Sequence, residues 1–302
     1  MLDAWNNHPA VKATLAQASA ALGQDLGELI QLGPKEELAL TTNTQPVMLV
    51  AGIAAYRVWQ AEGGEAPAML AGHSLGEYAA LVASRALSLK DALPLVRLRA
   101  QAMQDAVPLG RGAMAAVLGL DAAQVSLVCQ QVQSGYPADS QEVVQAANFN
   151  DPAQTVISGS QAAVAAACEA LKAAGAKRCL PLPVSAPFHC TLMKPAAERL
   201  RQALADVSIQ TPLIPVVNNI DVAIETDPDR IRDALYRQAF GPVRWVETIR
   251  QLQHQGVTHV VECGPGKVLT GMVKRITPDV NAHALHDPAT LAELMALFSA
   301  PQ

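Results

Sequence analysis

Apolar residues recur at helical spacing through most of the chain, and this spacing predicts several long helices. Residues 8–32 place one apolar side on a helix, formed by Val11, Leu15, Ala18, Leu22 and Leu26. A more apolar helix is predicted over 46–60, with Pro46 in its first turn, where a missing N–H is tolerated. Ser88-Leu89-Lys90-Asp91 resembles a capping box, and Pro94 is expected to bend the helix that follows or to delay its start. Further helices are predicted over 193–205, 229–238, 268–275 and 289–298.

Short apolar runs replace the helical spacing in the middle of the chain and predict strands. These runs occupy 112–118, 143–149, 155–158 and 176–182, with helical patterns over 121–132 and 161–174 between them. The resulting β-α-β-β-α-β order is typical of a ferredoxin-like module. Other short strands are predicted before Gly72, up to Asn219 and over 258–263. We therefore expect an α/β domain formed by 1–109 and 184–302, with a ferredoxin-like subdomain over 110–183 inserted into it.

Composition and charge narrow the class of protein. Of the 302 residues, 50% are hydrophobic and 16% are charged, so a large core is expected, and the net charge of −5 argues against a nucleic-acid-binding protein. The five cysteines follow no metal-ligand spacing, the N-terminus lacks a signal-peptide pattern, and the apolar run from Pro46 to Tyr56 is too short to cross a bilayer. We expect a cytoplasmic protein with reduced thiols, no bound metal and no membrane partner.

One stretch has the pattern of a nucleophile elbow. A short apolar run leads into Gly72-His73-Ser74-Leu75-Gly76, and an alanine-rich helical segment follows. Side chains at Gly72 and Gly76 are expected to collide with neighbouring backbone in such a tight turn. The turn places Ser74 at a helix N-terminus, where the amide of Leu75 points at developing negative charge. The pattern therefore predicts that Ser74 is a nucleophile.

A serine hydroxyl needs a base to take its proton, and the chain has seven histidines. His73 is expected to point away from the Ser74 hydroxyl. His189 lies in a proline-punctuated loop directly after a predicted strand, whereas His283 and His286 lie in a late loop, where ordinary α/β-hydrolases keep their base. The remaining three lie in helix or strand patterns that favour structural roles: His8, His254 and His259. The residues favour His189 but leave the late pair open.

Arg99 falls on an apolar helical face. It shares that face with Ala92, Leu95, Val96, Met103 and Ala106. Because an unpaired buried charge costs several kcal/mol, a guanidinium at this position needs a partner. A protein carboxylate, water reached by an extended side chain, and an anionic ligand are all compatible with the pattern.

Two other motifs could carry chemistry, and in both we favour a structural interpretation. Gly264-Pro265-Gly266-Lys267 could cradle an anion at a helix N-terminus, but it lacks the spacing of phosphate-binding and dinucleotide-binding loops. A tight turn after a buried strand explains it, and we expect no cofactor. Cys263 has no basic neighbour in sequence that would activate its thiol, so we expect it to pack in the core.

Several segments together resemble malonyl-CoA:acyl-carrier-protein transacylases. The matching segments, in the order and spacing of that family, are 72–78 (GHSLGEY), Arg99, 148–150 (NFN), 184–190 (VSAPFHC) and 262–269 (ECGPGKVL). The similarity runs over essentially the whole chain. It implies an α/β-hydrolase-like core with a mainly parallel sheet and an inserted ferredoxin-like subdomain, which agrees with the expected layout.

The resemblance also implies a mechanism. Ser74 attacks the malonyl thioester with His189 as general base, and the phosphopantetheine thiol of acyl carrier protein then takes the malonyl group, for fatty-acid chain elongation. Arg99 pairs with the free carboxylate of malonate, and Leu75 supplies an oxyanion amide. A backbone carbonyl, which falls at Gln238, orients the histidine.

The start of the chain departs from this family, whose members usually open with a buried strand and a Gly-Gln-Gly-Ser-Gln loop that donates to the oxyanion. This sequence begins Met1-Leu2-Asp3, past the end of that loop. We expect a truncated start, because loss of a central strand destabilises a sheet and one oxyanion donor is worth about 3 kcal/mol of barrier.

Two alternative functions remain: a serine esterase or thioesterase of the α/β-hydrolase type that uses a late histidine, and a truncated, inactive protein that binds the carrier. The expected partners are malonyl-CoA and an acidic acyl carrier protein, of fatty-acid or of polyketide synthesis, and the chain is expected to be a monomer. Six basic residues are candidates for carrier docking: Lys172, Lys177, Arg178, Lys267, Lys274 and Arg275.

Overall fold

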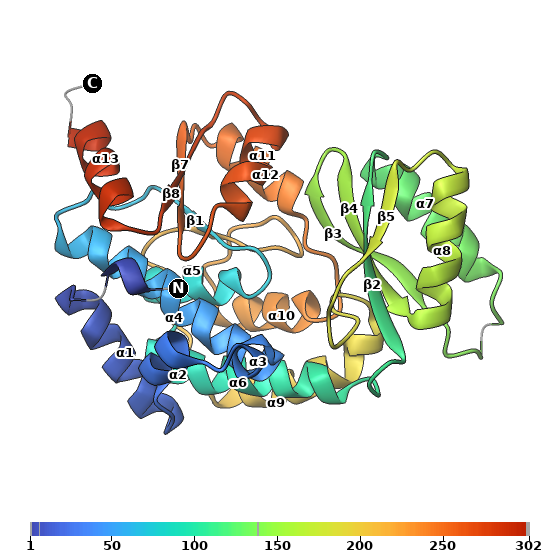
Figure 1. Cartoon of the computed structure of the whole chain (residues 1–302), viewed down its shortest axis with the longest axis horizontal. Helices are drawn as coiled ribbons and strands as arrows, with labels where there is room; N and C mark the ends of the chain where they lie inside the picture. The colour runs from blue at the N-terminus through green and yellow to red at the C-terminus, as the bar shows by residue number, and fades with distance from the viewer. Residues whose placement is uncertain (1, 6, 138, 300–302) are drawn as a thin grey trace.

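A computed structural model describes residues 2–5, 7–137 and 139–299 of the chain. These residues form a mixed α/β structure in which helices surround three small β-sheets. Figure 1 shows one sheet with its two helices at one end of the long axis, while the other two sheets lie among helices at the opposite end. None of the described helices is both long and apolar enough to cross a membrane.

The first part of the chain is a layer of helices. Its elements are η1 (Asp3–Trp5), α1 (Pro9–Leu22), α2 (Leu26–Leu32), α3 (Lys35–Ala39) and α4 (Thr41–Ala61). The single helix predicted over 8–32 is wrong, because Gly23 takes a left-handed conformation that ends α1 and the Asp25 side chain caps α2. The predicted place of Pro46 is also wrong, since α4 begins at Thr41 and Pro46 lies inside it.

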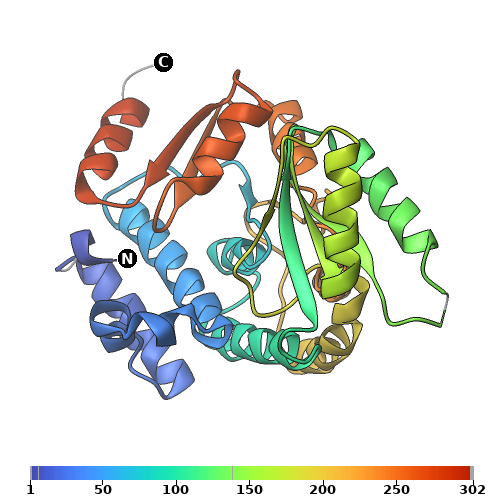
Figure 2. The ribbon, with the colours of Figure 1, turned by 45° about the vertical axis from the view of Figure 1, so that its right-hand side comes forward.

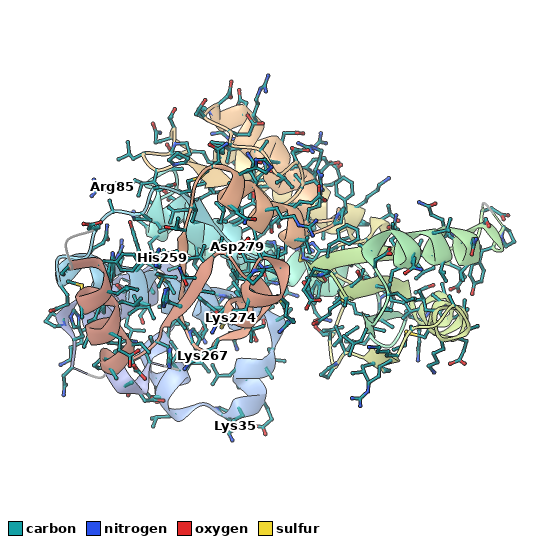
Figure 3. All side chains as sticks on the ribbon, turned by 90° about the horizontal axis from the view of Figure 1, so that it is seen from above. Lys35, Arg85, His259, Lys267, Lys274 and Asp279 are labelled. Carbon is teal, nitrogen blue, oxygen red and sulfur yellow. The ribbon has the colours of Figure 1, made fainter. Side chains whose placement is uncertain are left out.

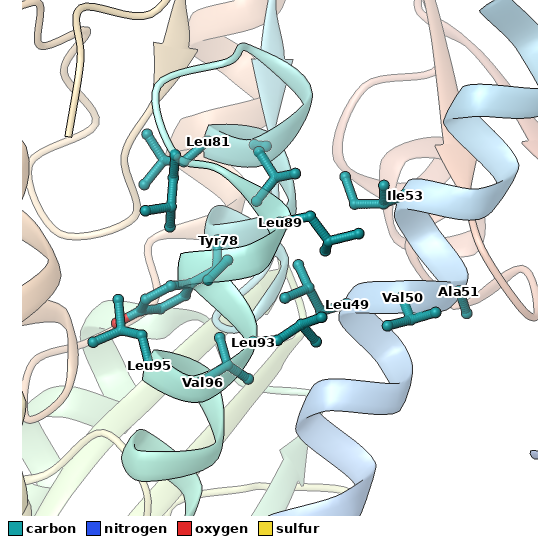
Figure 4. Packing of buried hydrophobic residues seen from close by; sticks show 14 of the residues in the cluster. Leu49, Val50, Ala51, Ile53, Tyr78, Leu81, Leu89, Leu93, Leu95 and Val96 are labelled. Atoms are coloured by element: carbon teal, nitrogen blue, oxygen red, sulfur yellow. The ribbon is translucent and has the colours of Figure 1, made fainter. Parts of the chain in front are cut away.

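The core of this part forms where apolar helix faces meet. The helices packed there are α4, α5 (Gly76–Ala83), α6 (Leu89–Asp105) and α9 (Lys194–Asp206), which follows η2 (Thr191–Met193). Figure 4 shows side chains of α4, such as Leu49 and Ile53, packed against Leu89 and Leu93 of α6. Ser88 caps α6 as predicted, and Pro94 lies inside the helix without delaying its start. This core fixes α6, which carries Arg99, and α5, which directly follows Ser74 and Leu75.

The middle of the chain has the predicted order of strands and helices. Its elements are β2 (Gly112–Leu118), α7 (Ala122–Ser134), β3 (Val144–Asp151), β4 (Gln154–Ser160), α8 (Gln161–Ala173) and β5 (Arg178–Pro181). The strands form an antiparallel sheet in the order β3-β4-β2-β5. Apolar residues of both helices, including Val125 and Leu171, cover one face of this sheet. Figure 2 shows α6 leading directly into β2.

Two pairs of parallel strands lie in the larger part. β1 (Leu70–Ala71) pairs with β6 (Val216–Val217), and β7 (His259–Cys263) pairs with β8 (Asn281–Leu285). The remaining helices are α10 (Pro228–Gln238), α11 (Trp245–His254), α12 (Val268–Ile276) and α13 (Pro288–Ser299). Because β1 and β6 are parallel, the turns that follow them emerge at the same edge. The sequence analysis missed α11 and β8, and His283 therefore lies in a strand rather than in a late loop.

Candidate active site

The turn between β1 and α5 holds Ser74 in a left-handed conformation, with a φ of 51°. A Cβ added at Gly72 would lie 1.9 Å from the carbonyl carbon of Gly76, so only glycine fits there. The expected collision at Gly76 is wrong, because a Cβ at that position would meet no atom within 4 Å. The predicted strand, turn and helix are present. The backbone of Gly76 lies close to Gly72, so Gly72 is the position that cannot carry a side chain.

Ser74 lies next to His189, although 115 residues separate them in the chain. The distance from Ser74 Oγ to His189 Nε2 is 2.7 Å, and His189 Nδ1 lies 3.0 Å from the carbonyl oxygen of Gln238. A carbonyl oxygen only accepts, so Nδ1 carries the proton and Nε2 is left to accept the serine hydroxyl. His189 also has a left-handed φ, 61°, so both residues are held in strained backbone.

The environment keeps His189 neutral. Its side chain is buried, and burial together with the positive charge of Arg99 lowers the pKa of His189 to about 3. A neutral imidazole with an unprotonated Nε2 has the protonation state that a general base requires.

Arg99 reaches the same hydroxyl from α6. Only 2% of Arg99 is exposed, and its guanidinium donates to Gln45 Oε1 at 2.6 Å, to Ser74 Oγ at 3.2 Å and to Gln238 Oε1 at 3.2 Å. The Tyr78 ring centre lies 5.5 Å from the guanidinium carbon. The sequence left three kinds of partner open for Arg99. The buried guanidinium does not reach water, and no carboxylate of the described residues lies within 4.0 Å of its nitrogens.

The buried side-chain amides of Asn219 and Gln238 form hydrogen bonds with the backbone of the Ser74 turn. The sequence analysis predicted this role for neither of them. Asn219 follows β6, accepts from the backbone N–H of Ser74 at 2.7 Å and donates to the carbonyl of Gly72 at 2.8 Å. The Gln238 side chain donates to the carbonyl of Ser74 at 3.0 Å and to Glu77 Oε2 at 2.9 Å. Polar residues directly after a buried strand, as in Asn218-Asn219, are the signal that could have pointed to the first of them.

The other histidines do not contact Ser74. His73 points away from the hydroxyl, as predicted, with Nε2 2.9 Å from Oδ1 of Asn150 on β3. His283 stacks on His259 with ring centres 5.6 Å apart, and His286 pairs with Asp287. The structure therefore brings His189 to Ser74 and leaves the late pair elsewhere.

The Gly-Pro-Gly turn and Cys263 agree with the structural interpretation. The Glu262 carboxylate caps α12 by accepting from the N–H groups of Leu269 and Thr270 at 3.2 and 2.7 Å. That helix end already has a carboxylate of the protein. Burial raises the pKa of the Cys263 thiol to about 12, so it stays protonated and is a poor nucleophile.

Comparison with known proteins identifies the family. The model of the acyl transferase domain matches residues 6–292. The chain belongs to the acyl transferase family. This acyl transferase is 52% identical over 297 residues to the malonyl CoA-acyl carrier protein transacylase of Escherichia coli K12, an alignment that covers 98% of the chain and 94% of that protein.

Solved structures agree with this assignment. The acyl-carrier-protein S-malonyltransferase of Burkholderia pseudomallei is 57% identical to this acyl transferase, with a TM-score of 0.94 and coverage of 98% of the chain and 94% of that structure. A malonyl-transacylase solved in complex with its type II PKS acyl-carrier protein is 48% identical, with the same TM-score and the same coverage. The fold and the family are therefore shared along almost the full length of these proteins.

Proposed function

We propose that this acyl transferase moves the malonyl group of malonyl-CoA to the phosphopantetheine thiol of acyl carrier protein, through an ester on Ser74, and so supplies fatty-acid elongation. The observation that carries this proposal is the buried guanidinium of Arg99, which lies 3.2 Å from the Ser74 hydroxyl and has no carboxylate partner among the described residues. A malonyl group on Ser74 brings a free carboxylate, which supplies the missing anion for a bidentate pair. The names of the relatives agree with this substrate and acceptor.

The mechanism follows from the contacts around Ser74. The hydroxyl attacks the thioester carbonyl of malonyl-CoA and gives its proton to His189 Nε2. The Gln238 carbonyl accepts a hydrogen bond from Nδ1–H and so keeps the imidazole ring in this orientation. The N–H of Leu75, at the start of α5, donates to the oxyanion. Collapse of this intermediate breaks the C–S bond, and His189 returns the proton to the departing thiolate. The carrier thiol then gives its proton to His189 Nε2 and its sulfur attacks the ester carbonyl. The C–O bond to Ser74 breaks, and His189 returns the proton to the Ser74 oxygen, which frees the hydroxyl.

Intact-mass spectrometry after mixing with malonyl-CoA tests this proposal. We expect a single malonyl adduct on the wild type and none on Ser74→Ala, and we expect the adduct to disappear when phosphopantetheinylated carrier protein is added. Absence of an adduct would favour an inactive carrier-binding protein. Loss of the adduct to water at the same rate with and without carrier would favour a thioesterase.

We also propose the finer architecture and assembly. An α/β-hydrolase-like domain over 1–109 and 184–302 is supported by the two parallel strand pairs, and a ferredoxin-like subdomain over 110–183 is supported by the β3-β4-β2-β5 order. We propose that the chain is a monomer, which light scattering coupled to size exclusion measures directly.

Two of the basic residues proposed to dock the carrier protein are already in ion pairs with carboxylates. Of the six basic candidates, Lys172 pairs with Glu169 at 2.8 Å and Arg275 pairs with Asp151 at 2.7 Å. Lys267 and Lys274, labelled in Figure 3, line a cavity of about 370 Å³ that is bounded by α12, β8 and α13. We propose that charge reversal at Lys267 and Lys274 raises the KM for carrier protein and leaves acylation by malonyl-CoA unchanged.

A further inference from the structure

Glu77 is a buried carboxylate for which the mechanism above has no role. It lies in the first turn of α5, and only 2% of it is exposed. Its Oε2 accepts two hydrogen bonds, from the backbone N–H of Asn219 and from Nε2 of Gln238, both at 2.9 Å. Asn219 and Gln238 are the residues that hold the Ser74 turn, so Glu77 lies directly beneath it.

The Gln238 side chain connects Glu77 to Arg99. Its Nε2 donates to the Glu77 carboxylate, and its Oε1 accepts from Arg99 Nη2 at 3.2 Å. One amide group therefore separates a buried carboxylate from a buried guanidinium, and its dipole is aligned with both charges. Because no carboxylate of the described residues lies within 4.0 Å of Arg99, this relayed contact gives Arg99 a counter-charge from the protein.

Two further carboxylates of the described residues lie near Glu77, and both are already paired. Asp221, after β6, raises the pKa of Glu77, but it is held by Arg237 in two hydrogen bonds of 2.7 and 2.6 Å. Glu225 lines a cavity of about 10 Å³ together with Glu77, and it pairs with Arg230 at 3.8 Å.

Tyr78, the next residue on α5, is another titratable neighbour of Glu77. Burial raises the pKa of Tyr78 to about 12, so this phenol stays neutral. Burial also raises the pKa of Glu77 itself to about 7, while hydrogen bonds from Gln238 and Asn219 and the charge of Arg99 act in the opposite direction. Glu77 thus changes its charge near neutral pH.

We propose that Glu77 is the internal counter-charge of Arg99, and that the malonyl carboxylate replaces it on binding, with uptake of one proton by Glu77. The inference rests on the proposed function, in which Arg99 binds that carboxylate. Two carboxylates around one guanidinium disfavour each other's ionisation, and the one buried in the protein is free to take a proton from solution. An acetyl group carries no charge, so its transfer does not change the protonation state of Glu77. Glu77 is then a positioning residue that links malonyl selectivity to pH.

The test compares the second-order rate constant of acylation by malonyl-CoA and by acetyl-CoA between about pH 5.5 and about pH 9, in the wild type and in Glu77→Gln. With malonyl-CoA we expect the wild-type rate to fall by about tenfold per pH unit above about 7, because deprotonated Glu77 must first take a proton. Glu77→Gln keeps an acceptor for Asn219 and Gln238 without the charge, and we expect it to abolish this fall. With acetyl-CoA we expect neither protein to show this fall in rate above about pH 7.

The matched control is Glu225→Gln, which changes a carboxylate at the same small cavity and is expected to keep the wild-type profile. A malonyl-specific fall that persists in Glu77→Gln overturns the inference. The proposed function fails separately if Arg99→Ala keeps its preference for malonyl-CoA.

The proposed proton uptake can also be measured on the wild-type protein, without any substitution. With a pH indicator at about pH 8 in weak buffer, acylation by malonyl-CoA should consume about one more proton per site than acylation by acetyl-CoA. Equal proton balances for the two substrates contradict the proposal without any substitution.

Discussion

Arg99 donates a hydrogen bond to the hydroxyl of Ser74, with Nη2 and Oγ 3.2 Å apart, and the same oxygen lies 2.7 Å from His189 Nε2. One hydroxyl is therefore in contact with a base and with a buried cation. The cation stabilises negative charge on the oxygen, but together with burial, which is the larger cause, it also lowers the pKa of His189 and so weakens the base. In the proposed acyl-enzyme, the malonyl carboxylate on Arg99 offsets that positive charge, so we expect a malonyl group to raise the basicity of the imidazole more than an acetyl group does.

Replacing Arg99 tests this relationship. In Arg99→Ala we expect acylation by malonyl-CoA to fall by about 10- to 100-fold, since hydrogen bonds to a charged group contribute about 1.5–3 kcal/mol. Acylation by acetyl-CoA should gain relative to acylation by malonyl-CoA, because an acetyl group has no carboxylate that pairs with the guanidinium. Stopped acylation reactions analysed by intact mass measure both rates.

Arg97→Ala is the control for Arg99→Ala. Arg97 lies on the same helix, and its guanidinium donates to Gln24, away from Ser74. We expect it to keep the wild-type ratio of malonyl to acetyl transfer. Unchanged selectivity in Arg99→Ala would remove the role given to that residue.

Two histidine substitutions separate the transacylase from an esterase with a late base. His189→Ala removes the group 2.7 Å from the Ser74 hydroxyl, and we expect acyl-enzyme formation to fall by about 10²- to 10⁴-fold. His283→Ala removes a ring stacked on His259, and we expect acylation to stay within about twofold of the wild type. The measurement is the rate of adduct formation on Ser74, and a reversed result would point to the esterase.

Local patterns were sufficient to predict the elbow and the central module. Three features depend on residues that are close in sequence: the Gly-x-Ser-x-Gly turn, the apolar helix face that includes Arg99, and the order of strands and helices along 110–183. The break at Gly23 was missed because the apolar spacing continues across it, and β8 was missed because Asn281–Leu285 alternates only weakly. Burial against β7, rather than the sequence of the segment, makes that strand.

The support beneath Ser74 could not be predicted from spacing. Asn219 is 145 residues from Ser74 and Gln238 is 161 residues from Glu77, and only the fold brings their amides together. The resemblance pointed to the Gln238 backbone carbonyl, but its side chain makes three further hydrogen bonds, to Arg99, Ser74 and Glu77. A buried amide has no distinctive sequence pattern, since its partners are set by the packing of separate elements.

The two glycines of the elbow are expected to respond differently to alanine. Gly72→Ala puts a Cβ 1.9 Å from the Gly76 carbonyl carbon, which the backbone cannot absorb, and we expect a loss of stability above about 3 kcal/mol or failure to fold. Gly76→Ala meets no atom within 4 Å and lies in the first turn of α5, so it should fold with wild-type stability or a gain of up to about 1 kcal/mol. Urea unfolding followed by circular dichroism gives both values, and equal effects at the two positions would contradict this account of the turn.

The raised pKa of Glu77 also predicts how stability depends on pH. Burial moves that pKa from 4.5 in the unfolded chain to about 7, so between these values the folded protein holds a proton that the unfolded chain has lost. Stability from this group is therefore fully present below about pH 4.5 and is lost as the pH rises through about 7, a change of about 3 kcal/mol. His189, whose pKa is lowered, acts in the opposite sense as the pH falls below 6.5, but it is shared by wild type and variant and cancels in their difference.

Glu77→Gln does not titrate, so its free energy of unfolding relative to the wild type should rise by about 3 kcal/mol between about pH 4.5 and about pH 8. Urea unfolding of both proteins at these two pH values measures the difference. Glu262→Gln serves as the control for removing a carboxylate elsewhere in the fold, because Glu262 caps α12 and does not contact the Ser74 turn. A constant difference for Glu77→Gln would mean that Glu77 ionises as readily in the folded protein as in the unfolded chain. Arg99 would then carry an internal counter-charge at neutral pH that a malonyl carboxylate must displace without help from a proton.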